Sequence, residues 1–138
     1  MNRPAGYSGT PLAQKLGIKP GFRLKTKSAP ADYEKLLAPL PEGVTISPRA
    51  KPPVDLWHLF VTARAALARQ VPACMKEIKQ DGMIWVSWPK KASGVASDIT
   101  EEVVREVALP LGLVDVKVCA IDQTWSGLKL VIRRANRQ

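Results

Sequence analysis

The sequence predicts a single α/β domain in which helices cover both faces of a mostly parallel sheet of about six strands. Two apolar runs of strand length, 54–61 and 83–88, are each bounded by turn-forming residues. Such runs are typical of central parallel strands that are covered on both faces. A stretch with helical spacing lies between them, so strand, helix and strand alternate. The length of 138 residues also fits one domain.

Before the first apolar run, short helices alternate with short strands. Residues 10–17 begin with Thr-Pro, a favourable helix start, and end in glycine, which predicts a helix. Residues 22–27 alternate apolar and basic side chains, which predicts a half-exposed strand. Residues 31–38 follow as a helix and 44–46 as a second short strand. We expect residues 1–9, which are polar and rich in glycine, to be flexible.

Two longer helices are predicted in the second half of the chain. Residues 63–79 place apolar side chains at spacings of four, four and three, which is a helical pattern. Pro72 lies inside this stretch and is expected to kink or divide the helix. The next helix begins where Asp98 or Thr100 can cap its N-terminus.

The chain closes with two strands, 113–121 and 128–133, joined by a short connection. A connection of this length predicts an antiparallel hairpin. The expected strand order along the sheet is therefore 2-1-3-4-6-5, with strand 6 antiparallel. Helices on both faces give a three-layer domain.

The composition excludes several classes of site. Cys74, Cys119 and the single histidine, His58, cannot supply the four ligands of a structural zinc site. We interpret both cysteines as buried thiols and His58, which has apolar neighbours, as a core residue. No apolar run approaches the roughly 18–20 residues that span a bilayer, and the N-terminus has no apolar signal core. We therefore expect a cytoplasmic protein without a membrane partner.

The net charge of +9 is concentrated at the two ends of the chain. Residues 1–27 carry six basic and no acidic side chains, and residues 129–138 carry four basic and none acidic. If the ends meet in space, they form a surface that attracts nucleic acid or another phosphate-bearing ligand. The alternative is that the charge serves solubility alone. The expected basic surface consists of Arg23, Lys25, Lys27, Arg133, Arg134 and Arg137.

A ligand site is expected outside the carboxyl ends of the strands, where open α/β sheets bind their ligands. The loops predicted there carry mainly cations, and two tryptophans stand where strands give way to loops. An aromatic face beside cations is how proteins hold nucleobases next to phosphates. Alternatively, the indoles seal the core and the loops are solvated. The candidate residues are Trp88, Lys90, Lys91, Ser93, Thr100, Trp125, Arg49, Lys51 and Arg64.

Residues 16–21 (LGIKPG), 79–89 (KQDGMIWVSWP) and the closing hairpin resemble segments of a shortened, Rossmann-like methyltransferase domain of the kind that uses S-adenosylmethionine. That family carries a Gly-rich loop after its first strand and an acid after its second. Here the corresponding segments are 26–32, which has no glycine, and 47–49 (SPR), which has no acid. These departures predict that S-adenosylmethionine does not bind and that the chain has no cofactor.

Three segments, 6–13 (GYSGTPLA), 88–94 (WPKKASG) and 112–127 (GLVDVKVCAIDQTWSG), resemble an uncharacterised bacterial family, the domain of unknown function 3052. The resemblance covers nearly the whole chain. Because that family has no assigned activity, it implies no catalytic residues.

The sequence therefore predicts a pseudoenzyme, a non-catalytic module that binds an anionic partner on a methyltransferase-like scaffold. No nucleophile elbow or catalytic triad is recognisable. Two alternatives stay open. One is a protein-interaction scaffold without a small ligand, which leaves room for a protein partner or a homo-oligomer. The other is an enzyme of unrecognised chemistry.

Overall fold

The computed structural model describes residues 9–138 and confirms the predicted α/β fold class. The six strands are β1 (Arg23–Lys27), β2 (Thr45–Ser47), β3 (Val54–Phe60), β4 (Ile78–Pro89), β5 (Leu113–Ala120) and β6 (Trp125–Ile132). They lie in the order β2-β1-β3-β4-β6-β5, as predicted. β6 runs antiparallel to both of its neighbours, β4 and β5, whereas the pairs β1–β2, β1–β3 and β3–β4 are parallel. The expected flexibility of residues 1–9 concerns a segment that lies, but for Gly9, outside the described residues.

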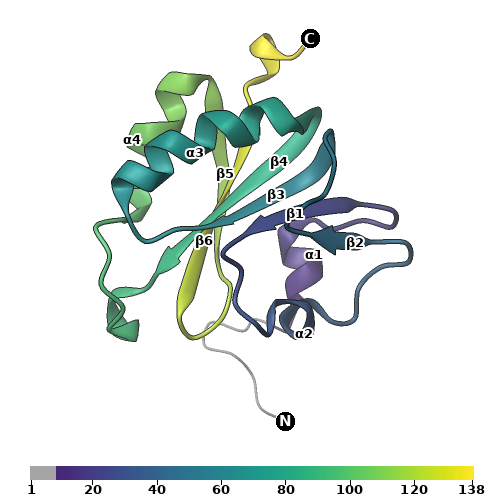
Figure 1. Cartoon of the computed structure of the whole chain (residues 1–138), viewed down its shortest axis with the longest axis horizontal. Coiled ribbons are helices and arrows are strands. Elements are labelled where there is room, and N and C mark those ends of the chain that lie inside the picture. Colours follow the sequence, from purple (N-terminus) through teal and green to yellow (C-terminus); the bar gives the residue numbers. More distant parts are fainter. Residues whose placement is uncertain (1–8) are drawn as a thin grey trace.

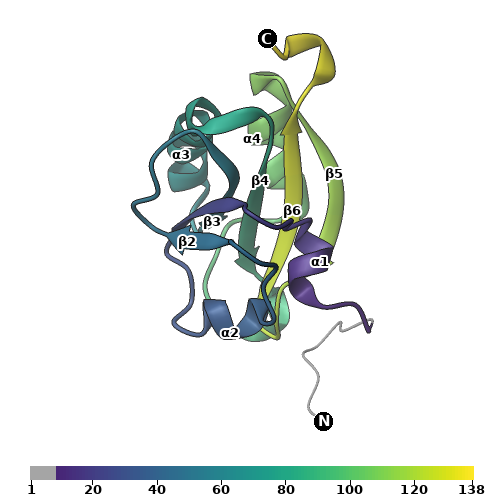
Figure 2. The same cartoon turned by 90° about the vertical axis from the view of Figure 1, so that its right-hand side faces the viewer.

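Helices cover the sheet on both faces (Figure 1, Figure 2). The helices α1 (Leu12–Leu16) and α2 (Tyr33–Leu37) lie on one face, and α3 (Arg64–Glu77) and α4 (Glu101–Ala108) on the other. Short 3-10 helices occupy Lys91–Ser93, Leu109–Leu111 and Arg134–Asn136. Within residues 9–138, every helix is too short or too polar to cross a bilayer.

The central strands β3 and β4 separate two hydrophobic clusters. From β3, Trp57 and Leu59 pack toward α3 and α4, whereas Leu56 and Phe60 pack toward α1 and α2. The same alternation holds in β4, where Trp85 belongs to the α1 and α2 side. The two apolar runs are thus central strands covered on both faces, as predicted.

Two local predictions need correction, and the choice left open at the start of α4 is decided. Pro72 does not divide α3, which runs without interruption from residue 64 to 77; a proline removes only one backbone donor, and buried side chains on both sides of it hold the helix against the sheet. The N-cap of α1 is Pro11 rather than Thr10. Thr100 caps α4 by accepting a hydrogen bond from the Val103 N–H, whereas Asp98 Oδ1 accepts from the backbone N–H of Arg64, at the start of α3.

A buried polar chain joins α2 to the two central strands. The Tyr33 hydroxyl and His58 Nδ1 are 2.7 Å apart, and His58 Nε2 and Ser87 Oγ are also 2.7 Å apart. The imidazole stacks on Phe60 with ring centroids 4.2 Å apart. Burial lowers the pKa of His58 to about 3, so the ring is neutral, with one nitrogen that donates and one that accepts. The predicted core role of His58 is therefore correct.

This histidine should make stability depend on pH. Its pKa in the unfolded chain is about 6.5, so the unfolded state takes up a proton first as the pH falls. The free energy of unfolding should therefore drop below about pH 6.5, by about 1.4 kcal/mol per pH unit, down to about pH 3. Urea denaturation at a series of pH values measures this slope. Because His58 is the only histidine, His58→Gln should flatten the curve between pH 6 and 5, and an unchanged slope would contradict the assignment.

Candidate functional site

A groove lies between β1 and α3, on a part of the sheet that no helix covers. The connection from β2 to β3, residues 48–53, contains no helix, so the α3 side of β1 stays open (Figure 1). The hollow there has a volume of about 460 Å³. We call it the β1 groove, and its lining consists of Lys25, Thr26, Lys27, Ser28, Pro48, Trp57, Gln70, Ala73, Cys74 and Glu77.

The β1 groove reaches the topological switch point of the sheet, where the order of successive strands reverses. β1 and β3 are neighbours in the sheet. The chain continues from β1 to β2 toward one edge of the sheet, and from β3 to β4 toward the opposite edge. Crevices outside the carboxyl ends of strands at such a switch point are where open α/β sheets bind ligands. Lys27 is the last residue of β1 and Ser28 follows it, and both lie at that end of the groove.

The other end of the groove is fixed by one carboxylate. Glu77 Oε1 accepts hydrogen bonds from Lys25 Nζ at 2.8 Å and from Trp57 Nε1 at 2.9 Å. The Lys25 ammonium also lies 5.7 Å from the Trp57 ring centroid, a cation–π distance. Burial alone would raise the pKa of Glu77, but the hydrogen bonds from Lys25 and Trp57 lower it. The carboxylate is therefore ionised, and it neutralises Lys25.

The turn that follows β1 is left-handed. Ser28 has a φ of 60°, and among residues 9–138 no other non-glycine residue has a positive φ. This conformation costs an L-residue about 1–2 kcal/mol. Strain of this kind is concentrated at functional sites. Serine therefore makes the left-handed turn after β1 without glycine.

The two cysteines are free thiols. Cys74 is buried in the groove wall, and burial, with Glu77 adding to it, raises the pKa of its thiol to about 12. Cys74 is thus protonated and does not serve as a nucleophile. Cys119 is only half-buried, in contrast to the prediction, because it lies on the edge strand β5. In the described part of the chain, no three acidic, histidine or cysteine side chains gather in a way that could hold a metal ion.

The two tryptophans of the predicted loop site lie on opposite faces of the sheet. Trp88 is buried in the cluster under α3 and α4. Trp125 packs edge-on against Phe60 on the α1 and α2 side, with ring centroids 5.1 Å apart. The two indoles therefore do not form one stacking platform, because neighbouring positions of the paired strands β4 and β6 direct them apart.

The polar residues of the same predicted site make structural contacts. Lys90 Nζ donates to the Asp122 carbonyl at 2.7 Å, and Ser93 Oγ donates to the Lys90 carbonyl. Arg64 pairs with Glu106. The side chains of Arg49, Lys51 and Lys91 are exposed, and Thr100 caps α4 as described above. Binding of a ligand by this set stays a prediction.

The residues expected to form one basic surface are spread over the sheet. Lys25 is neutralised by Glu77, and the Arg23 guanidinium donates to the Lys51 carbonyl. The arginines Arg133, Arg134 and Arg137 follow β6, which is separated from β1 by β3 and β4. Three strand spacings amount to about 14 Å. The two groups are therefore not neighbours in the sheet, and their use in binding polyanions stays a prediction.

Comparison with solved structures identifies the fold as a Rossmann-like methyltransferase fold. The Methanococcus jannaschii fibrillarin pre-rRNA processing protein has a TM-score of 0.62 at 10% identity, over 91% of this chain and 70% of its own. TrmN from Thermus thermophilus has a TM-score of 0.53 at 12% identity, and the match covers 88% of this chain and 47% of TrmN. The B. subtilis m1A22 tRNA methyltransferase TrmK has a TM-score of 0.50 at 8% identity, and the match covers 92% of this chain and 67% of TrmK. No family model and no curated protein matches in sequence, so the likeness to the domain of unknown function 3052 stays a prediction.

These similarities correct the functional prediction. A non-catalytic, pseudoenzymatic anion-binding module was expected from the missing cofactor motifs. The structures that share the fold include a named methyltransferase, and the alternative of an enzyme agrees with them better. The loss of a motif argues against one mode of cofactor binding, and it does not decide whether the site is catalytic.

The charges at the switch point do not fit S-adenosylmethionine, the cofactor that the fold implies. Its sulfonium is a cation, whereas this end of the groove carries Lys27, and Arg49 follows β2. No carboxylate stands at the end of β2 to take the ribose hydroxyls, and Ser47 Oγ instead accepts from the Arg49 N–H. The left-handed turn at Ser28 fits the backbone of such a site, but the side chains do not.

The turn at Ser28 can be tested by substitution. Glycine adopts a positive φ without the steric cost that a Cβ imposes, so Ser28→Gly should stabilise the protein by up to about 1 kcal/mol. Ser28→Val should destabilise it by more than about 1 kcal/mol, because β-branched residues tolerate this conformation poorly. Urea denaturation of both variants provides the measurement. A glycine variant less stable than the valine variant would show that the turn is not left-handed in solution.

Proposed function

We propose that this chain is a group-transfer enzyme of the methyltransferase fold and that the β1 groove is its small-molecule site. The observation that carries the proposal is the position of the groove at the switch point between β1 and β3. Its volume of about 460 Å³ is in the range of small-molecule sites. Because the chain spans 70% of fibrillarin and 47% of TrmN, the activity of those proteins does not follow from the fold.

Group transfer does not require the groove to contain a catalytic nucleophile activated by a general base. Holding two reactants in the right orientation can lower the activation free energy by about 7–11 kcal/mol, without any covalent step on the protein. The fixed contacts among Glu77, Lys25 and Trp57 provide a rigid inner end against which a ligand can be oriented. Gln70 also lines the groove, and its side-chain amide offers both a donor and an acceptor.

The charge of the groove suggests the chemistry of its ligand. Lys25 is neutralised by Glu77. Lys27, which is exposed and forms no ion pair within residues 9–138, is the cation that remains at the carboxyl end of β1. A ligand with an anionic group at this end gains a favourable contact with Lys27 and with the Ser28 hydroxyl. We therefore propose an anionic small molecule rather than a sulfonium as the ligand.

Two alanines of α3 provide a matched test. Ala73 lines the groove and Ala68 does not, and both are exposed. Ala73→Trp should fill the groove, whereas Ala68→Trp adds the same side chain elsewhere on the helix. Each protein is incubated with a cell metabolite extract, and consumed and formed compounds are measured by mass spectrometry. We expect turnover by the native protein and Ala68→Trp, with a loss of at least about tenfold in Ala73→Trp because binding orients the reactants. Equal turnover by both variants, or none by the native protein, would overturn the proposal.

S-adenosylmethionine-dependent methyl transfer is the second candidate, and the left-handed turn at Ser28 favours it. TrmK, which shares the fold, is named as a tRNA methyltransferase, so bulk tRNA is a suitable acceptor to test. We expect no calorimetric binding of S-adenosylmethionine tighter than about 100 μM and no transfer of tritiated methyl to tRNA. Binding and transfer that both disappear in Ala73→Trp would establish this second candidate and refute the anionic ligand.

A further inference from the structure

Four lysines gather on the face of the sheet opposite the β1 groove. Lys15 belongs to α1, Lys19 follows it, Lys117 lies in β5 and Lys129 in β6. Lys129 Nζ lies beside Gly17, 3.6 Å from the position that a Cβ on this glycine would take. Lys117 is the register partner of Lys129, and Lys15 and Lys117 line one hollow of about 640 Å³. We call these four residues the lysine face.

An irregularity in β5 brings the two strand lysines together. Asp115 pairs with Leu130, but the next pair along the ladder is Lys117 with Lys129, so Val116 is an extra residue. In a regular ladder Val116 would oppose Lys129, and Lys117 would point to the other face of the sheet. The bulge therefore turns Lys117 onto the side that carries Lys129 and α1.

Three lysines of the lysine face carry a charge that no ion pair of the described residues compensates. None of the ion pairs in residues 9–138 involves Lys19, Lys117 or Lys129. Burial lowers the pKa of Lys129, and the charges of Lys117 and Lys19 lower it further. Lysines that repel one another cost stability, and an anion placed among them would remove this cost.

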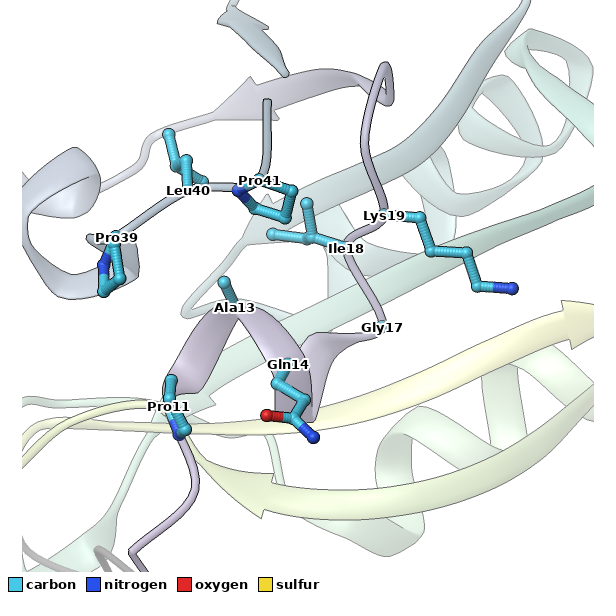
Figure 3. Close-up of a pocket in the computed structure, with 9 residues that line it drawn as sticks. All are labelled: Pro11, Ala13, Gln14, Gly17, Ile18, Lys19, Pro39, Leu40 and Pro41. Atoms are coloured by element: carbon cyan, nitrogen blue, oxygen red, sulfur yellow. The ribbon is translucent and has the colours of Figure 1, made fainter. Parts of the chain in front are cut away.

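An apolar hollow adjoins the lysine face. Its volume is about 480 Å³, and its lining includes three proline rings with Ile18 and Leu40, while Lys19 and Gln14 stand at its rim (Figure 3). Gly17, the neighbour of the Lys129 ammonium, is also part of the lining. An apolar hollow next to several cations matches a ring held beside phosphates.

We propose that the lysine face binds the phosphate backbone of a single-stranded nucleic acid and that the adjoining hollow receives an unpaired base. A base can enter an apolar hollow only when it is not paired, which favours a single strand over a duplex. Lysine ammoniums are point charges that suit a phosphate backbone without selecting a sequence. Because the sheet separates this surface from the β1 groove, the proposal does not depend on the enzyme assignment.

The test is fluorescence anisotropy with a labelled single-stranded RNA oligonucleotide over a range of salt concentrations. The triple variant Lys19→Gln, Lys117→Gln, Lys129→Gln should bind at least about tenfold more weakly at low salt, and the slope of log K against log salt should fall by about 2, at about 0.7 per lost contact. The matched control replaces Arg69, Lys76 and Lys79, which are exposed elsewhere, by glutamine. It removes the same charge and should leave the slope unchanged.

Gln14→Glu is a second variant that does not depend on the triple replacement. Gln14 lines both hollows, and glutamate has nearly the same shape but adds a negative charge. It should weaken RNA binding at least about threefold through repulsion of the phosphates, with an unchanged melting temperature. Equal losses in the triple variant and its control would reduce the effect to net charge and overturn the proposal. Tighter binding to a polyglutamate peptide than to RNA, or equal binding to duplex RNA, would also overturn it.

Discussion

The pairing of β3 with β4 is the constraint on which the rest of the structure depends. Where the two strands are covered on both faces, at residues 56–60 and 83–89, nearly every side chain is apolar. His58 and Ser87 are exceptions, and each finds its partner inside the core. Their chain of hydrogen bonds extends to Tyr33 and thereby fixes α2 against the sheet. Because α2 follows the loop after β1, the same buried contacts hold the turn at which the groove opens.

The fold could be predicted from the sequence because its signals are local. Apolar runs identified β3 and β4, and the short connection identified the hairpin. The site could not be predicted in this way, because it depends on contacts between distant residues and on a helix that the β2–β3 connection lacks. Lys25 and Glu77 are 52 residues apart, and no periodicity links them. Lys117 faces Lys129 only because Val116 is an extra residue in the ladder, and alternation alone would have assigned these lysines to different faces.

The functional prediction failed for a related reason. The missing glycine and the missing acid predicted the loss of the cofactor and of catalysis, yet the backbone at Ser28 has the left-handed turn without glycine. The shape of a switch-point site depends on the backbone and the strand order, whereas ligand choice depends on the side chains that line it. Here the strand order of the fold is present, and Lys27 gives the carboxyl end of the groove a positive charge. A changed ligand explains this combination better than a lost one.

The two proposed surfaces also differ in how they hold their charge, which gives them different physical behaviour. In the groove, Lys25 and Glu77 are largely shielded from solvent and form a direct ion pair at 2.8 Å, so dissolved salt screens this contact weakly. Within residues 9–138, Lys19, Lys117 and Lys129 of the lysine face form no ion pair, and the attraction of this face for a polyanion acts through solvent. At physiological ionic strength the Debye length is about 8 Å. Phosphates farther than this from the lysines therefore add little to the binding free energy. Binding on the lysine face must therefore be local, and the apolar hollow beside Lys19 is what can give it a fixed register.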